Sequence, residues 1–433
     1  MKALRVALVY PYFRTRAPTE LLFSPLGVAY LAAQLRELGI EARVFDCTFS
    51  SFEQFQEALV DYQPGIVGIY CMVTLSRNTF RVAEMVRSHL PGSLLVVGGP
   101  LPTLYPENFS KSFDAVFRGE ADLSFPIFCR DFIRLGTGGQ KGLAVLPLGG
   151  YAGLYIHQNG TRINNPIAHY SEKKIDNFPL PYRGDFDHAA YQMAGKIKDG
   201  TKTASIITTY GCPYDCDFCS KPVFGRLFRR RKPESVIEEV EQIRDLGYDR
   251  LWIADDSITL DPTYLKEFCQ QIAGQEVTWS CLSRVTGIDA ETVQLMKRGG
   301  CSRVYLGLET GSQETLRLMN KKATVEDGVR AVHLFHEAGI EVAAFFIVGY
   351  PGETLASIEK TFQFALQMPL SEISFNVPFP LPGSRLFERV SDLDKTKDWD
   401  KENEVTFVYH SEFDEEWLRG RIEETMQAFA NKK

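Results

Sequence analysis

Three cysteines near the middle of the chain form its clearest chemical pattern. Cys212, Cys216 and Cys219 fall within eight residues, in a loop directly after a predicted strand at 205–209. Thiolates spaced in this way can converge on one metal centre, and Cys is the usual ligand of iron–sulfur clusters. A cubane cluster contains four irons, whereas this loop supplies three ligands. One iron would therefore stay open, which a catalytic cluster needs and a pure electron carrier does not.

Two other interpretations of the same cysteines are a zinc site with a remote fourth ligand and a set of incidental thiols. Structural zinc usually closes its tetrahedron with paired short spacings of Cys or His. The sequence has seven histidines, the nearest to the loop being His188, and it has no second CxxC pair. These observations favour an iron–sulfur cluster.

The overall composition limits the class of protein. The 433 residues correspond to two large domains or three of ordinary size. The 48 basic and 55 acidic residues leave a net charge of −7, which argues against a general nucleic-acid or polybasic membrane binder. Nine cysteines, six of them scattered singly, fit a reducing compartment. No targeting segment and no transmembrane run are evident, so we expect a monomeric cytoplasmic protein that does not bind nucleic acid.

The cysteine loop must be positioned by the elements around it, and these alternate between strands and helices. In the first part of the chain, short apolar strands are predicted at 5–12, 42–46, 65–70, 93–97 and 115–117, with helices between them. This order predicts an α/β, Rossmann-like, doubly wound parallel sheet over residues 1–135. Residues 136–200 are rich in Gly and Pro and are expected to form an irregular linker, with a hairpin near 154–163.

The alternation resumes after the linker. Six strand–helix units between residues 203 and 377 predict a closed or partly closed (β/α)6 barrel of the TIM type, occupying residues 201–384. Residues 385–433 are expected to form a short C-terminal tail or cap with a helix at 414–431. The active site of such a barrel lies at the carboxyl ends of its strands, where the cysteine loop also falls.

The CxxxCxxC loop at the end of the first barrel strand resembles that of the radical S-adenosylmethionine (SAM) superfamily. The resemblance implies a [4Fe-4S] cluster held by Cys212, Cys216 and Cys219, whose open iron binds SAM and whose reduction generates a 5′-deoxyadenosyl radical. Polar residues and glycines at the ends of later strands match the superfamily's SAM contacts. The SAM-binding residues that the resemblance implies are Phe218, Asp255, Asp256, Ser283, Arg284, Glu309 and Gly349.

The sequence departs from the superfamily pattern at one segment, and other roles remain possible for some of the residues that match it. The second barrel strand ends in Ala254-Asp-Asp-Ser257, where much of the superfamily has a Gly-Gly-Glu segment. Asp256 or Ser257 can instead start a turn or cap the next helix. Arg284 and Glu309 can instead form an ion pair at the barrel mouth.

The first sheet lacks the GxGxxG loop of dinucleotide-binding folds, but small-residue loops follow its third, fourth and fifth strands. These loops resemble the cobalamin-binding domain that is fused to some radical SAM enzymes. The usual cobalt-ligating His is missing, because no His precedes His89. A degenerate, empty domain is the alternative, although the glycines then have no evident structural need. The cobalamin contacts that the resemblance implies are Cys71, Met72, Val73, Thr74, Gly98, Gly99, Pro100, Thr103, Gly119 and Glu120.

Together these resemblances point to a cobalamin-dependent radical SAM methyltransferase that acts on an unactivated carbon, or on phosphorus, of a small molecule. A non-methylating cyclase or rearrangement enzyme, and a non-catalytic cobalamin or iron–sulfur sensor, are the alternatives. A reductant such as flavodoxin or ferredoxin is the implied partner. The one dense basic run, at 226–232, is expected to be a solvated face, or else to bind SAM, an anionic substrate or the reductant.

Overall fold

The computed structural model describes residues 5–14, 22–135, 143–158, 160–221, 223–390 and 407–432. Within it the chain divides into two compact units. The first comprises the chain up to Lys202 with a short piece around Phe224, and the second begins at Thr203. The division agrees with the expected change from one α/β fold to another, and each unit is described separately.

The first unit is built on a seven-stranded sheet in the order β2-β1-β3-β4-β5-β6-β7. Its first five strands are parallel neighbours, as the alternation of strands and helices predicts. The strands are β1 (Val6–Tyr10), β2 (Ala42–Asp46), β3 (Ile66–Tyr70), β4 (Leu94–Gly98), β5 (Ala115–Phe117), β6 (Leu154–Gln158) and β7 (Thr161–Asn164).

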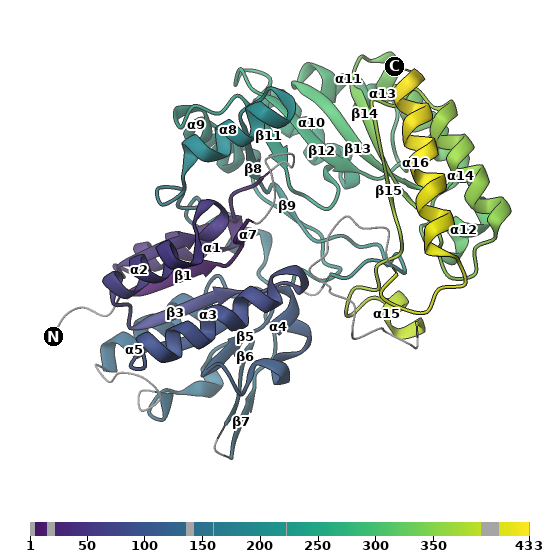
Figure 1. Cartoon of the computed structure of the whole chain (residues 1–433). Helices are drawn as coiled ribbons and strands as arrows, with labels where there is room; N and C mark the ends of the chain where they lie inside the picture. Colours follow the sequence, from purple (N-terminus) through teal and green to yellow (C-terminus); the bar gives the residue numbers. More distant parts are fainter. Residues whose placement is uncertain are drawn as a thin grey trace. The chain divides into compact units, whose positions relative to one another are not determined.

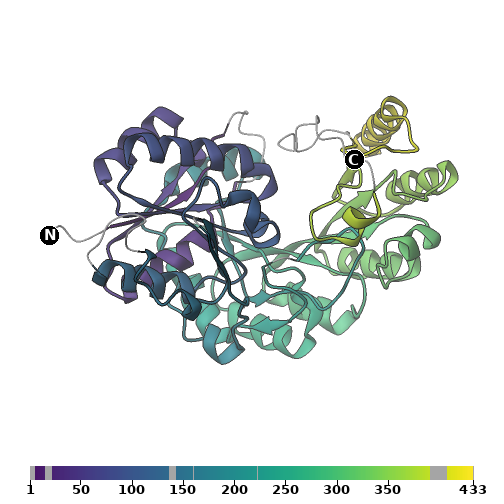
Figure 2. The same ribbon diagram turned by 90° about the horizontal axis from the view of Figure 1, so that it is seen from below.

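Helices cover both faces of this sheet, as Figures 1 and 2 show. Helices α1 (Leu26–Glu37), α5 (Ser124–Leu135) and α8 (His188–Asp199) contribute to the hydrophobic core on one face. Helices α2 (Phe52–Tyr62) and α3 (Ser76–His89) contribute to the core on the other face. Since the strands are buried on both sides, they are continuous apolar runs rather than alternating ones. The expected doubly wound sheet is therefore confirmed.

The expected linker at 136–200 requires a correction, because its described part, from residue 143 on, is folded into the first unit. Strand β6 pairs antiparallel with β5, and β7 pairs with β6, so the anticipated hairpin extends the first sheet. Beyond the hairpin, the hydroxyl of Tyr191 donates to Asp46 at 2.6 Å, and the Arg36 guanidinium lies 3.7 Å from the centre of the Tyr182 ring. The Gly and Pro residues thus make turns within a folded domain. Residues 136–142 lie outside the described residues.

The second unit contains a six-stranded parallel sheet in the order β15-β14-β13-β12-β11-β8. Among the described strands no pairing joins β8 to β15, so the sheet matches the partly closed alternative. A short antiparallel pair, β9 (Thr209–Tyr210) with β10 (Arg229–Arg230), borders the cysteine loop. The strands of the large sheet are β8 (Thr203–Ile206), β11 (Arg250–Ile253), β12 (Thr278–Ser283), β13 (Cys301–Glu309), β14 (Glu341–Ile347) and β15 (Glu372–Asn376).

A layer of helices covers the outer face of the second sheet and buries a large hydrophobic core against it. Helix α16 (Glu415–Lys432) lies close to the predicted range of the C-terminal helix, 414–431. It contributes Phe429 to the same core. Residues 391–406 of the expected tail lie outside the described residues. The helices that cover the outer face are α9 (Pro233–Asp245), α10 (Pro262–Ile272), α11 (Ala290–Arg298), α13 (Val325–Glu337) and α14 (Leu355–Gln367).

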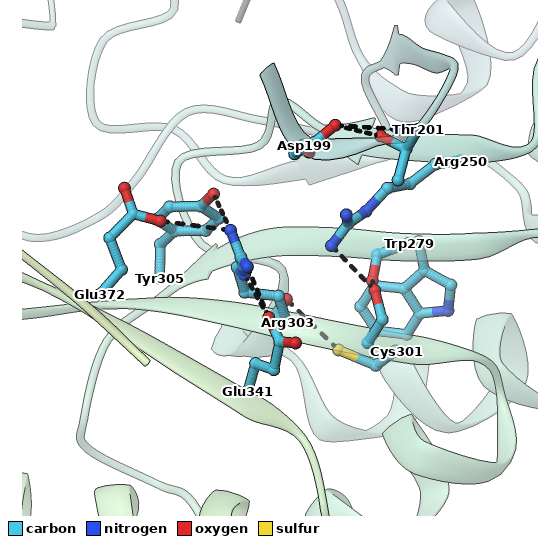
Figure 3. Close-up of polar contacts among 10 residues, drawn as sticks. Asp199, Thr201, Arg250, Trp279, Cys301, Arg303, Tyr305, Glu341 and Glu372 are labelled. Carbon is cyan, nitrogen blue, oxygen red and sulfur yellow. Dashed lines mark hydrogen bonds and ion pairs between the residues drawn. The ribbon is translucent and has the colours of Figure 1, made fainter. Parts of the chain in front are cut away.

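The inner face of the second sheet is aromatic and charged near the beginnings of its strands. The Tyr305 ring contacts the Trp252 ring edge-on at 5.1 Å and stacks on Phe345 at 5.7 Å. Figure 3 shows the guanidinium of Arg303 between the carboxylates of Glu341 and Glu372, at 2.6 and 3.2 Å. These contacts tie three adjacent strands together at the end opposite to the cysteine loop.

Candidate functional site

The cysteine loop lies directly after β9. Cys212 and Cys216 are buried, with 7% and 9% of their surface exposed, and Cys219 is half-buried. Burial raises the pKa of the Cys219 thiol, and the nearby Lys221 ammonium opposes that rise. Within the described part of the chain, no three His, Cys, Asp or Glu side chains are grouped as ligands of a single metal ion.

A buried arginine lies beside the cysteines. Nη1 of Arg284 donates to Sγ of Cys216 at 3.4 Å, and the guanidinium lies 3.6 Å from the centre of the Tyr214 ring. Nη2 donates to the backbone carbonyl of Lys321. Nε is buried and has no hydrogen-bond partner among the described residues. A buried donor without a partner is costly. The spare donor and the cation beside the Cys216 thiol therefore fit a negatively charged cluster and an anionic ligand.

A buried ion pair forms the next part of this site. Glu309 and Lys321 contact one another, and each side chain is only 7% exposed. Glu309 has a φ of +64°, which is strained for a residue with a side chain and is typical of functional positions. A Cβ on Gly307 would lie 2.5 Å from a Glu309 carboxylate oxygen, so a side chain there would force the ion pair to move. The Lys321 ammonium lies 5.8 Å from the centre of the Phe218 ring.

The two aspartates after β11 have separate roles. The carboxylate of Asp255 accepts hydrogen bonds from Thr208 N at 2.7 Å and from the hydroxyls of Thr208 and Thr209. Its burial raises its pKa to about 6. Asp256 pairs with Lys221 at the cysteine loop. Asp255 therefore fixes the backbone that leads into the cysteine loop. Asp256 holds Lys221, which lies two residues after Cys219.

Ser283 and Gly349 also lie at strand ends of the second unit. The Ser283 hydroxyl hydrogen-bonds Thr259 at 2.7 Å and the carbonyl of Arg284 at 2.7 Å. Gly349 follows β14 and begins a turn closed by Glu353, whose carboxylate accepts from Gly349 N at 2.9 Å and Tyr350 N at 3.0 Å. Burial raises the pKa of Glu353 to about 7. The structure thus brings the arginine, the glutamate and the cysteine loop together, and it places Ser283 and Gly349 in the supporting turns.

Several residues of this site were not found by sequence reasoning. Each contacts a predicted site residue, contacts the cysteine loop, or belongs to the supporting turns: Lys321, Tyr214, Tyr350, Glu353 and Arg389. Lys321 belongs to a short loop after α12 (Gln313–Leu318) that has no recognisable motif. Glu353 ends the segment Gly349-Tyr-Pro-Gly-Glu353 after β14, and the sequence alone assigned it no role.

In the first unit, the residues predicted to contact cobalamin lie at the carboxyl edge of the sheet. Cys71 N donates to Gly98 O at 2.8 Å, so the loops after β3 and β4 lie against each other. Gly99 has a φ of +115°, and a Cβ there would lie 2.5 Å from Cys71 O. The expectation that these glycines have no structural need was wrong, because this close approach requires Gly99. Met72 and Val73 are half-buried apolar side chains at the same edge, which suits contact with a corrin ring.

The remaining residues of this edge are joined by hydrogen bonds. The Thr103 hydroxyl donates to Gly99 O at 2.7 Å and accepts from Gly119 N at 2.9 Å. Glu120 is 5% exposed and contacts His169 Nδ1 at 3.0 Å. Thr74 and Pro100 are half-buried in the same loops. The edge therefore consists of three mutually braced loops with small residues and backbone groups, which fits a large ligand lying against strand ends.

The basic run at 226–232 is only partly a solvated face. Arg226 is 59% exposed and pairs with Asp215 at 3.3 Å. By contrast, Arg231 is 3% exposed and pairs at 2.6 Å with Glu239, which is fully buried. Arg229 and Arg231 are thus part of the protein interior.

Comparison with known proteins agrees with this division. The model of the radical SAM superfamily matches residues 206–365, and that of the B12 binding domain matches residues 16–128. An uncharacterized methyltransferase of Pyrococcus horikoshii is 29% identical over 422 residues, covering 93% of this chain and 86% of that protein. An anaerobic magnesium-protoporphyrin IX monomethyl ester cyclase of Rubrivivax gelatinosus is 27% identical, covering 93% of this chain and 73% of that protein.

A solved structure has the same fold over most of the chain. It is the radical SAM methyltransferase TsrM of Kitasatospora setae with cobalamin and a [4Fe-4S] cluster bound. The TM-score is 0.73 at 18% identity, with 89% of this chain and 77% of that chain covered.

The two units therefore define a protein with a B12-binding domain followed by a radical SAM domain. These are the two domains of cobalamin-dependent radical SAM enzymes, and they imply a [4Fe-4S] cluster, SAM and cobalamin as cofactors. The expected fold class, family and cofactors are confirmed. Of the helices in the described ranges, none is both long and apolar enough to cross a membrane.

Proposed function

We propose that the protein is a methyltransferase that transfers a methyl group from SAM to an unactivated carbon, or to phosphorus, of a small molecule. When bound, the cluster and SAM supply a carbon-centred radical, and cobalamin carries the methyl group. The observation that supports this most directly is the buried Arg284, whose guanidinium contacts Cys216 and keeps one donor free. The relative named as a methyltransferase covers nearly the whole chain and supports the same proposal.

The residues of the second unit would have distinct tasks in this reaction. Cys212, Cys216 and Cys219 would ligate the cluster. Arg284 would hold a negatively charged group of SAM beside it, since its guanidinium is buried and incompletely paired. The Glu309–Lys321 pair would contact the polar parts of SAM, with Phe218 against its apolar parts.

The carboxyl edge of the first sheet would hold cobalamin. Met72, Val73 and Thr74 would face the corrin ring, and the loop at Gly98 and Gly99 would pass along the nucleotide tail. The other proposed contacts belong to the braced loops after β4 and β5: Cys71, Pro100, Thr103, Gly119 and Glu120.

A second candidate is a radical SAM cyclase that consumes SAM without transferring its methyl group. The specific observation in its favour is the relative named as a protoporphyrin ester cyclase, which covers as much of this chain as the methyltransferase does. The two candidates differ in what becomes of SAM. Methyl transfer yields S-adenosylhomocysteine as well as 5′-deoxyadenosine, whereas a cyclase yields 5′-deoxyadenosine alone.

The experiment is anaerobic turnover of reconstituted, cobalamin-loaded protein with a low-potential reductant and methyl-labelled SAM. We expect S-adenosylhomocysteine to form, with label lost from SAM, and 5′-deoxyadenosine to form in parallel. Production of 5′-deoxyadenosine without any S-adenosylhomocysteine would instead favour the cyclase.

Two cysteine variants test the ligand assignment. Cys212→Ala should lose the iron and sulfide of the cluster and all 5′-deoxyadenosine formation, yet retain cobalamin in the separate first unit. Cys301→Ala is the matched control, because Cys301 is a buried core cysteine of the same unit, 1% exposed. It should retain iron and activity. Iron retained by Cys212→Ala would contradict the assignment.

A further inference from the structure

The segment after the last strand of the second sheet lies against the cysteine loop. The Ser220 hydroxyl donates to Pro382 O at 2.6 Å. Leu386 N donates to Asp217 O at 2.9 Å. These contacts join residues more than 160 positions apart in the sequence.

The short helix α15 (Arg385–Arg389) adds two ion pairs to these contacts. Arg385 pairs with Asp215 at 2.6 Å, and Arg389 pairs with Asp217. Residues four positions apart lie on the same face of a helix, so one face presents both guanidinium groups to two aspartates of the loop. The helix begins at the N-cap Ser384, which is 1% exposed, so its position is fixed by the protein interior.

The two ion pairs differ in their surroundings. Asp215 is 25% exposed, whereas the Asp217 side chain is only 8% exposed. Asp217 also accepts a hydrogen bond from the Tyr350 hydroxyl at 3.0 Å, and its backbone N donates to Met319 O at 2.9 Å. Exposed ion pairs contribute little, but loss of the partner of a buried carboxylate is costly. Asp217 is therefore the stronger of the two attachment points.

Asp217 lies between Cys216 and Cys219 in the sequence. We propose that α15 clamps the cluster loop and that Arg389 is a positioning residue, which acts through Asp217 on the retention and the reduction potential of the cluster. This inference rests on the assignment of the three cysteines as ligands. Without Arg389, the loop opens more often and the Asp217 carboxylate is left as an uncompensated negative charge near the cluster. Opening exposes the cluster to chelators, and the negative charge disfavours its reduction.

Four variants of the full-length, cluster-loaded protein test the proposal. Arg389→Met removes the cation, Arg389→Lys restores it, and Asp217→Asn removes the carboxylate charge at constant shape. Arg421→Met is the matched control, because Arg421 makes a comparable ion pair with Glu359 away from the loop, at 2.7 Å. Two quantities are measured without turnover: the rate of cluster loss to EDTA, followed by its visible absorbance, and the midpoint potential, followed by electron paramagnetic resonance.

Arg389→Met should lose its cluster at least about fivefold faster than the unmodified protein, the ratio that corresponds to roughly 1 kcal/mol. Arg389→Lys should return to within about twofold, and Arg421→Met should match the unmodified protein. Asp217→Asn should also lose the cluster faster. The potential should become more negative in Arg389→Met and more positive in Asp217→Asn, because the first change leaves a negative charge and the second removes one. A loss of general stability alone would not shift the potential in opposite directions.

Unchanged cluster loss in Arg389→Met, or equal acceleration in Arg421→Met, would overturn the clamp. Potential shifts of the same sign in Arg389→Met and Asp217→Asn would overturn the charge effect. If Arg389→Met does not fold, Asp217→Asn decides the proposal by the same two measurements. A wrong ligand assignment is recognised separately, since Cys212→Ala would then retain iron.

Discussion

The buried ion pair between Glu309 and Lys321 gives a prediction whose magnitude follows from its burial. Lys321→Met keeps most of the side-chain volume and removes the charge, which leaves the Glu309 carboxylate without its partner at 7% exposure. Removal of one partner of a buried pair costs about 3–5 kcal/mol. With a urea slope of about 2–3 kcal/mol per molar, the unfolding midpoint should fall by roughly 1–2.5 M.

Tryptophan fluorescence is a suitable signal for this experiment. All four tryptophans lie at or beyond residue 252, so their fluorescence reports on the second unit. The metal-free protein is used, because a bound cluster would add its own binding free energy to the stability. The double variant Glu309→Gln/Lys321→Met should recover most of the lost stability, since it leaves no unpaired charge.

The control for this prediction is Arg330→Met. Arg330 is 55% exposed and pairs with Asp327 on the surface of α13, so its loss should change stability by less than about 0.5 kcal/mol. If Lys321→Met is as stable as this control, or if the double variant is no more stable than Lys321→Met, the desolvation of the pair has been overestimated and the reasoning is refuted.

Three further predictions concern stability. The unfolded pKa of Glu353 is about 4.5 and its folded pKa is about 7, so the native state binds the extra proton and stability should fall by about 3 kcal/mol as pH rises through that window. Glu353→Gln should flatten this part of the pH profile of urea unfolding, and an unchanged slope would contradict it. Gly99→Ala should cost at least about 2 kcal/mol, because of its positive φ and the clash at 2.5 Å, and amide exchange in β3 and β4 would reveal the loss. Arg231→Met should cost about 3–5 kcal/mol, because it removes the ion-pair partner of the buried Glu239 carboxylate. Arg226→Ala, at 59% exposure, should change stability by less than about 0.5 kcal/mol, and similar urea midpoints for these two arginine variants would argue against an interior role for the run.

The elements of both sheets could be predicted from the sequence because their periodicity is local. The predicted strand at 42–46 coincides with β2, and the predicted helix at 414–431 lies one residue from α16. The linker prediction failed for a nonlocal reason. Whether β6 joins the first sheet depends on the exposed edge of β5, which the sequence of the hairpin does not reveal.

The candidate site was predictable where a motif marks it and not where single residues meet through the fold. The cysteine loop and the strand-end residues Arg284 and Glu309 were predicted from the sequence, and the structure brings them together. Lys321 was missed, because it meets Glu309 only through the fold and lies in a loop after α12 that has no motif. Asp255 was predicted to contact SAM, and in the structure its carboxylate oxygens accept hydrogen bonds from Thr208 and Thr209. Polar residue type alone does not distinguish these two uses.

The contact between Asp217 and Arg389 also has a consequence for the order of events during synthesis. The two residues are 172 positions apart, so most of the second unit must leave the ribosome before they can meet. The three cysteines are translated early, but the contact of their loop with α15 can form only after α15 has been translated. Iron–sulfur carriers that deliver to a finished loop would then act on the chain only after translation of the second sheet is complete, and a nascent chain stalled before residue 389 should accept iron poorly.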